Sequence, residues 1–295
     1  MTLGDLIRCI RPKQWAKNGF VLMAPIFARK VMDPGLIPAI AASFAAFCLA
    51  SSAVYVINDM FDREADRGHP VKKNRPIASG RMLVPESVCV ALVLIVGAFL
   101  LSAKLPTKFQ AMIMGYLVMN VAYSWVLKRV VILDVMIIAS GFVIRAVAGG
   151  LAIDVPVSHW LVLCTTMLSL FLASVKRRQE LVHLGEGAER HREALTRYDV
   201  GFLDQMISIS ASSTLLSYSL YTVSEETIRK LGTDGLKWTL PFVLFGIFRY
   251  LFLIHVKNSD GDPTRLLFSD MTLLIDLLIW SLTVAYILSG GVVHP

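Results

Sequence analysis

Long apolar segments recur along the whole chain, and they constrain its fold more than any other feature. A helix that crosses the hydrocarbon core of a bilayer, about 30 Å thick, needs about 20 mostly apolar residues. The chain is 55% hydrophobic and only 17% charged, whereas soluble domains carry about 25% charged residues. A soluble domain and a disordered chain are therefore excluded. We count nine such runs, at residues 16–32, 36–60, 84–103, 109–127, 130–153, 157–176, 203–224, 236–256 and 267–289.

These runs predict an all-α, polytopic membrane protein with nine transmembrane helices. If the N-terminus is cytoplasmic, the inside segments hold 20 of the 29 lysines and arginines and the outside loops hold 7. Because cytoplasmic loops are enriched in basic residues, we expect a plasma-membrane protein with its N-terminus inside and its C-terminus outside. The net charge of +7 then reflects contact with lipid headgroups, and we expect no nucleic-acid partner.

Two of the inside loops, near residues 63–83 and 177–202, are longer than a connection requires. Both mix acids, bases and glycine, whereas the outer loops are short. We therefore expect one domain over residues 1–295, with these two loops capping its cytoplasmic side. Function is expected on that cytoplasmic face.

A cluster of acids stands where the second run ends. If the helix continues, steps of about 100° per residue place Asp59, Asp62 and Asp66 on one face, with Asn58 on its flank. Packed carboxylates repel one another, and oxygen-only ligands select a hard cation such as Mg²⁺. The alternative is a solvated acidic helix end. The basic segment 69–80 that follows favours a magnesium–diphosphate site.

The pattern NDxxDxxxD at residues 58–66, followed by RPIASG at 75–80, resembles the UbiA superfamily of intramembrane prenyltransferases. The resemblance implies nine transmembrane helices around a cytoplasm-facing cavity that opens laterally to the membrane. It also implies that Asn58, Asp59, Asp62 and Asp66 hold Mg²⁺ and a diphosphate, with the three aspartates as catalytic residues.

One departure from the superfamily pattern separates its branches. Aromatic prenyltransferases of the superfamily carry a second acidic motif after the sixth span, where this chain has SVKRRQE at 174–180. A basic pocket binds phosphate directly. With RPKQWAKN at 11–18 and GFVIR at 141–145, this resembles the decaprenyl-phosphate phosphoribosyltransferases. That branch moves 5-phosphoribose from phosphoribosyl diphosphate (PRPP) to a polyprenyl phosphate, giving a lipid-linked phosphoribose for envelope glycans.

Several polar residues are candidates for substrate binding by charge and position. Asp134 and Arg145 share a helical face with Gly141, and Arg145 either contacts a distal phosphate or pins a neighbouring acid. Arg249 and Asp270 are expected to pair with each other. The full set of substrate-binding candidates is Lys17, Asn18, Asn58, Lys73, Arg75, Tyr123, Lys128, Asp134, Arg145, Lys176, Arg177 and Arg178.

The expected chemistry needs no general base, because a phosphate monoester with a second pKa of about 6 is already mostly dianionic at pH 7. The main rival is an aromatic prenyltransferase acting on a quinone or haem precursor. A secondary transporter that uses the acids as an ion site is a weaker one, because the chain has no evident internal symmetry. Whether the protein forms a homo-oligomer, and the length of the polyprenyl chain, are left open.

Overall fold

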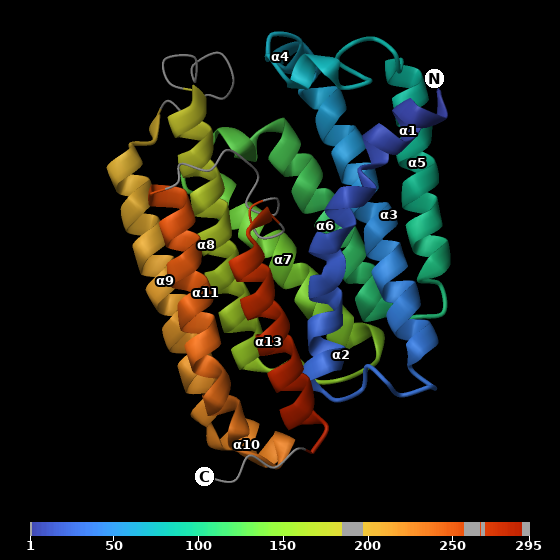
Figure 1. The fold of residues 1–295 in the computed structure, drawn as a ribbon. Coiled ribbons are helices and arrows are strands. Elements are labelled where there is room, and N and C mark those ends of the chain that lie inside the picture. The colour runs from blue at the N-terminus through green and yellow to red at the C-terminus, as the bar shows by residue number, and fades with distance from the viewer. Residues whose placement is uncertain (1, 185–196, 257–265, 267–268, 291–295) are drawn as a thin grey trace. The chain divides into compact units, whose positions relative to one another are not determined.

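The structure is a computed structural model that describes residues 2–184, 197–256, 266 and 269–290 (Figure 1). All regular secondary structure in this part of the chain is helical. The described residues divide into two compact units. One runs from the N-terminus to Val162 and includes Arg197, and the other comprises Leu163 to Leu184 and the chain from Tyr198 onward. The prediction of a single domain stays a prediction.

The first unit contains seven α-helices and three 3₁₀ segments among its described residues. They are α1 (Leu3–Ile10), η1 (Pro12–Leu22), α2 (Met23–Phe27), α3 (Ile37–Phe61), α4 (Arg63–Arg67), η2 (Lys72–Asn74), α5 (Val84–Leu101), α6 (Thr107–Trp125), η3 (Leu127–Arg129) and α7 (Leu133–Ala152).

The second unit takes up most of α8 (His159–Leu184), which begins in the first. It continues with α9 (Val200–Val223), α10 (Glu225–Leu231), η6 (Gly235–Thr239), α11 (Leu240–His255) and α13 (Met271–Leu288).

Each of the nine apolar runs is largely helical in the described residues, so the all-α prediction is confirmed. Six helical segments are long and apolar enough to cross a membrane: α3, α5, α7, α8, α11 with η6, and α13. The helices α6 and α9 are long but more polar, and the first run folds as η1 and α2 rather than one long helix. The count of nine spanning helices therefore stays a prediction.

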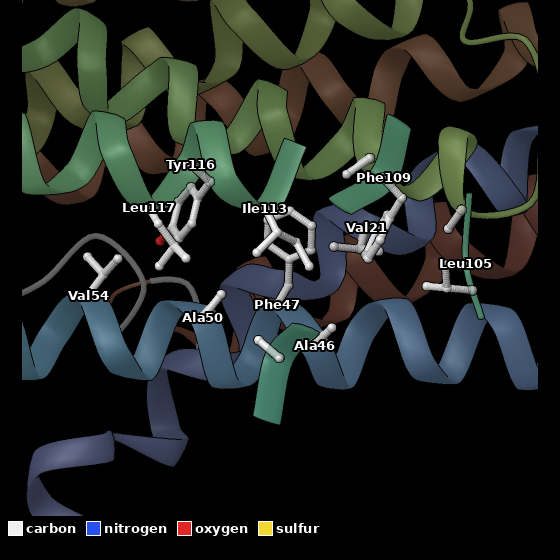
Figure 2. Packing of buried hydrophobic residues seen from close by; sticks show 13 residues of the cluster. Val21, Ala46, Phe47, Ala50, Val54, Leu105, Phe109, Ile113, Tyr116 and Leu117 are labelled. Carbon is white, nitrogen blue, oxygen red and sulfur yellow. The ribbon is translucent and has the colours of Figure 1, made fainter. Parts of the chain in front are cut away.

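The core of the first unit forms where α3 faces α6. Phe47 of α3 is fully buried and meets Phe109 and Tyr116 of α6 edge-on, with ring centroids 5.8 and 5.7 Å apart. Figure 2 shows Phe47 pointing from α3 toward the α6 side chains, with Val21 of η1 beside them. Small residues such as Ala46 and Ala50 let the elements approach closely. This packing anchors the middle of α3, the helix whose C-terminal end carries Asp59.

The second unit has its own core between α8, α9 and α11. Phe171 of α8 packs on Tyr250 of α11, with ring centroids 5.5 Å apart, and Ile207 of α9 is fully buried beside them. Arg249 donates to Asp270 at 2.8 Å, so the predicted pairing of these two residues is confirmed.

Two boundaries differ from the sequence expectation. The helix that carries the acids does not continue unbroken: α3 ends at Phe61, Asp62 caps it with ψ near 0°, and α4 begins at Arg63. The expected loop 177–202 is shorter at both ends, because α8 extends to Leu184 and α9 begins at Val200; its residues 185–196 lie outside the described part. The loop 63–83 contains two short helical segments, α4 and η2.

Candidate active site

Two buried acids share one arginine at the end of α3. Asp59 is 2% exposed and Asp66 is 4% exposed. Arg75 follows η2, and its Nη1 lies 2.9 Å from Asp59 Oδ1 and 2.6 Å from Asp66 Oδ2. Burial raises the pKa of Asp66, while the nearby Arg75 charge acts in the opposite direction. Arg75 therefore contacts both buried acids directly, and its expected role in binding a diphosphate stays a prediction.

The third acid belongs to a second group of contacts within the same unit. Lys128 of η3 donates to Asp62 Oδ1, and Asn58 donates to Asp62 Oδ2 at 2.9 Å. Ser124, near the end of α6, in turn donates to the Asn58 amide oxygen at 3.1 Å. Because α3 breaks at Asp62, this carboxylate turns to Lys128 while Asp59 and Asp66 face Arg75.

Arg11 completes the set of bases around the acids. Its Nη2 donates to both carboxylate oxygens of Asp59, at 2.5 and 2.6 Å, and its guanidinium lies over the Tyr55 ring, 5.1 Å from the centroid. Arg11 has φ +51° and ψ +63°, and it is the residue at which α1 ends and η1 begins. This left-handed conformation is uncommon for a residue other than glycine.

The donor set at these acids fits a hard cation. In the described residues, no group of three or more His, Cys, Asp or Glu side chains gathers as metal ligands. Asp59 and Asp66 nevertheless bind the same cationic group, since both carboxylates contact Nη1 of Arg75. Carboxylate oxygens are the ligands that Mg²⁺ prefers. The prediction that Asn58, Asp59, Asp62 and Asp66 bind Mg²⁺ stays a prediction.

Asn18 and Arg145 form a buried polar link deeper in the first unit. Arg145 is 5% exposed. It donates to Asn18 Oδ1 at 2.8 Å, to the Gly141 carbonyl at 2.7 Å and to the Tyr116 hydroxyl at 2.8 Å. Asp134 and Gly141 are also buried in α7, as their predicted shared face requires. These hydrogen bonds of Arg145 go to neutral oxygens of the protein, which supports a structural role. Their acceptors are not the neighbouring acid that the sequence suggested, and the phosphate contact stays a prediction.

The other substrate-binding candidates of the first unit differ in their exposure to solvent. Tyr123 is buried near the end of α6, Lys17 is half-buried on η1, and Lys73 is exposed on η2.

The basic triplet of α8 lies in the second unit. Arg177 is 1% exposed and pairs with Glu180 one turn later. Arg178 donates to Asp204 of α9 at 2.5 Å, and His255 of α11 contacts the same carboxylate at 3.1 Å. Lys176 is half-buried beside them. The three-helix contact through Asp204 joins α8, α9 and α11 within that unit.

Sequence reasoning missed two residues of the site. Arg11 belongs to the RPKQWAKN segment that was singled out, but its charge alone does not reveal a partner 48 residues away. Ser124 carries no charge and lies 66 residues from Asn58, so nothing in the sequence marks it.

Comparisons with known proteins identify the family to which the chain belongs. Residues 19–268 match the family described as the UbiA prenyltransferase family. The chain is 33% identical to decaprenyl-phosphate phosphoribosyltransferase of Mycolicibacterium smegmatis, over 94% of this chain and 90% of that protein. It is 34% identical to the protein of the same name from Corynebacterium glutamicum, over 93% and 84% of the two chains.

A solved structure shares the fold. It is a UbiA homolog from Archaeoglobus fulgidus bound to DMAPP and Mg²⁺, with a TM-score of 0.73 and 16% identity, covering 98% of this chain and 100% of that one. The family match covers most of the chain, and its long apolar helices are those of a multi-pass membrane protein. The chain therefore belongs to the UbiA prenyltransferase family.

Proposed function

We propose that the protein transfers 5-phosphoribose from PRPP to a polyprenyl phosphate and releases diphosphate. The product is a lipid-linked phosphoribose that supplies envelope glycan synthesis. The observation that carries the proposal is the likeness, over most of both chains, to two proteins named decaprenyl-phosphate phosphoribosyltransferase. The site supports it, because clustered acids and bases suit a metal-bound, polyanionic substrate.

Mg²⁺ is the proposed cofactor, held by Asp59, Asp62 and Asp66 with Asn58 beside them. The oxygen donors and the cation already bracketed by Asp59 and Asp66 support this assignment. When bound, Mg²⁺ would supply positive charge to the diphosphate oxygens. The A. fulgidus homolog was solved with Mg²⁺, which supports a divalent ion in this fold.

The reaction breaks the bond between ribose C1 and a diphosphate oxygen, and it forms a bond from C1 to a phosphate oxygen of the lipid. Negative charge grows on the departing diphosphate, and fixed cations stabilise such charge. The positive charge would come from Arg11, Arg75 and Lys128, because their cationic nitrogens form ion pairs with the acids of the site. The lipid phosphate attacks as a dianion, so no residue needs to remove a proton from it.

The basic triplet Lys176, Arg177 and Arg178 is proposed to bind a bare phosphate, either of the lipid acceptor or of the far end of PRPP. Its residues belong to helix α8, so they are held by regular backbone. Arg178 is restrained by Asp204 at 2.5 Å, which limits the rotamer entropy that binding would cost. The topology expected from the sequence, with the N-terminus inside, assigns both the acidic segment and the basic triplet to the cytoplasmic side.

The rival function is transfer of a prenyl group to an aromatic acceptor. The specific observation in its favour is that the A. fulgidus homolog was solved with DMAPP, a prenyl diphosphate. The inverted charge of the α8 segment argues against it, because a second metal–diphosphate clamp needs acids where Lys176, Arg177 and Arg178 stand.

A product assay separates the two functions. Purified protein in detergent is incubated with labelled PRPP, Mg²⁺ and polyprenyl phosphate, and the molecular mass of the extracted lipid is measured by mass spectrometry. The proposal expects a lipid heavier by one phosphoribosyl group and free diphosphate. A product only from prenyl diphosphate and an aromatic acceptor would establish the rival.

The α8 triplet provides a second test. Arg178→Gln should raise the KM of a phosphate-bearing substrate roughly 10- to 100-fold, as expected for one lost charged hydrogen bond. The Mg²⁺ dependence should not change, because no proposed ligand is altered. Arg249→Gln, which breaks the ion pair with Asp270, is the matched control and should leave KM unchanged. An unchanged KM in folded Arg178→Gln would favour a purely structural triplet.

A further inference from the structure

The segment η1 is held in place by buried polar contacts on two sides. Asn18 of η1 is fully buried. Its amide nitrogen donates to Ser51 Oγ of α3 at 3.1 Å, while its amide oxygen accepts from Arg145 of α7 at 2.8 Å. One side chain therefore links three elements, and Arg145 supplies the charged half of the link.

A second contact brackets Arg11 itself. Ser52 of α3 donates to the Ile10 carbonyl at 2.8 Å and accepts from the Trp15 indole at 3.0 Å. Chain positions on both sides of Arg11 are thus tied to the helix that carries Asp59. Such over-determination is what sustains an uncommon backbone conformation, here the φ of +51° at Arg11.

The backbones of η1 and α7 also touch. A Cβ placed on Gly149 would overlap the Val21 carbonyl oxygen, so only glycine fits there. Gly149 is one turn beyond Arg145 in α7, and Val21 is one 3₁₀ turn beyond Asn18. The polar link and the close approach are therefore successive contacts of one interface.

We propose that Arg145 and Asn18 are positioning residues that act through η1 to hold the Arg11 guanidinium on Asp59. Arg145 has two features that fit this role rather than a substrate contact. Three of its N–H groups are used by protein oxygens, and its guanidinium lies over the Tyr116 ring, 4.7 Å from the centroid. The inference rests on the proposed function only where it links Arg11 to the reaction rate.

The first experiment needs no activity. Arginines of the purified, full-length protein are modified with phenylglyoxal and their rates are followed by peptide mass spectrometry. Arg11, whose guanidinium is hydrogen-bonded to Asp59 in the wild type, should react slowly, and Arg145→Met should make it react faster. Arg8, exposed in the same helix α1, is the internal reference and should not change.

The second experiment is a double-mutant cycle on turnover. Arg145→Met should lower kcat roughly 10- to 100-fold in the wild-type background, with little change in the KM of PRPP. In an Arg11→Gln background it should have almost no further effect, because Arg11 is the residue through which it acts. Arg145→Lys should not restore the rate, because an ammonium cannot make the three forked contacts.

A gentler pair of variants serves if Arg145→Met fails to fold. Tyr116→Phe removes one acceptor of Arg145 and should shift Arg11 reactivity and kcat in the same direction by a smaller factor. Tyr218→Phe is the matched control, since the Tyr218 hydroxyl is also buried and bonded, to Thr239 at 2.6 Å, and it should leave both unchanged.

Unchanged Arg11 reactivity together with a raised KM for PRPP that is additive with Arg11→Gln would overturn the inference and make Arg145 a substrate contact. If the wild type makes no lipid-linked phosphoribose, the proposed function fails, and the phenylglyoxal rates still decide the inference.

Discussion

At the scale of single residues, the main feature of the site is that its charged carboxylates are buried. Asp59 and Asp66 are almost fully buried, and a carboxylate taken out of water is costly unless it is paired and hydrogen-bonded. Arg11 and Arg75 meet that requirement here. The same pairing keeps cationic groups where a diphosphate would bind, so the contacts that stabilise the acids also prepare the site.

Asp59→Asn should lower turnover roughly 10²- to 10³-fold, a loss typical of removing one preorganised charge contact. Asparagine has the same shape and can still accept a hydrogen bond from Arg11, so the fold should persist. Turnover is measured from labelled PRPP, and folding by thermal melting in detergent.

Glu64→Gln is the matched control for Asp59→Asn, because Glu64 is an exposed acid of the same segment that pairs with Arg67 at 2.9 Å. It should keep full activity. Chelation by EDTA should mimic Asp59→Asn and added Mg²⁺ should reverse it; full activity in EDTA would contradict the metal role.

Asp5 provides a pH-dependent prediction outside the membrane spans. Hydrogen bonds from Thr2, together with Arg81 at 3.0 Å, lower the pKa of Asp5 below 3.8. A lowered native pKa means that the ionised form stabilises the fold. That contribution is present above pH 3.8 and is lost as the pH falls through the native pKa.

Melting temperatures measured from pH 7 to pH 3 test this sign. The wild type should lose its advantage over Asp5→Asn as the pH falls. A difference between the two proteins that stays constant over this range would contradict the prediction.

At the scale of elements, the first apolar run shows how local sequence and packing combine. Pro12 begins the segment, and η1 is followed by the short helix α2 instead of one long helix. The 3₁₀ geometry rises more steeply per residue than an α-helix. The 3₁₀ conformation of η1 is stabilised by its contacts with α3 and α7, which compensate for the missing α-helical hydrogen bonds.

The contact between η1 and α7 predicts a large asymmetry between two helical glycines. Gly149→Ala should destabilise the protein by about 1–3 kcal/mol, as in overpacked cores, because its Cβ would overlap the Val21 carbonyl. Gly115→Ala in α6 meets nothing within 4 Å and should be neutral or stabilising by up to about 1 kcal/mol. Thermal melting of both variants measures the difference, and equal effects would refute the close approach.

At the scale of the whole molecule, the basic residues set the expected orientation in the membrane. Lysines and arginines are concentrated in the segments expected inside, and such asymmetry determines topology. Lys73 on η2 and Lys230 at the end of α10 are both exposed, and the predicted topology expects them on opposite sides of the bilayer.

Single cysteines at positions 73 and 230 should be labelled from opposite sides in sealed vesicles. Position 73 should react only with a cytoplasmic reagent and position 230 only with an external one. The four native cysteines are first replaced, since Cys89 is exposed. Labelling of both positions from the same side would disprove the expected topology.

The helices of this protein and the position of its acidic cluster can be predicted from local sequence. The apolar runs predict the helices, because run length and composition determine whether a segment can lie in lipid. The acids at the end of α3 and the basic loop after them predict a site at that end, because both lie within a few turns of one another.

Tertiary structure decided the polar pairs that join distant parts of the sequence. Arg11 reaches Asp59 from 48 residues away, Lys128 reaches Asp62 from 66, and Arg145 reaches Asn18 from 127. Spacing cannot reveal such partners, because they are set by how helices pack and where a helix breaks. The left-handed backbone of Arg11 and the end of α3 at Phe61 arise in the same way. The sequence therefore determined the class of the protein and the position of its acids, and helix packing determined which distant bases form ion pairs with those acids.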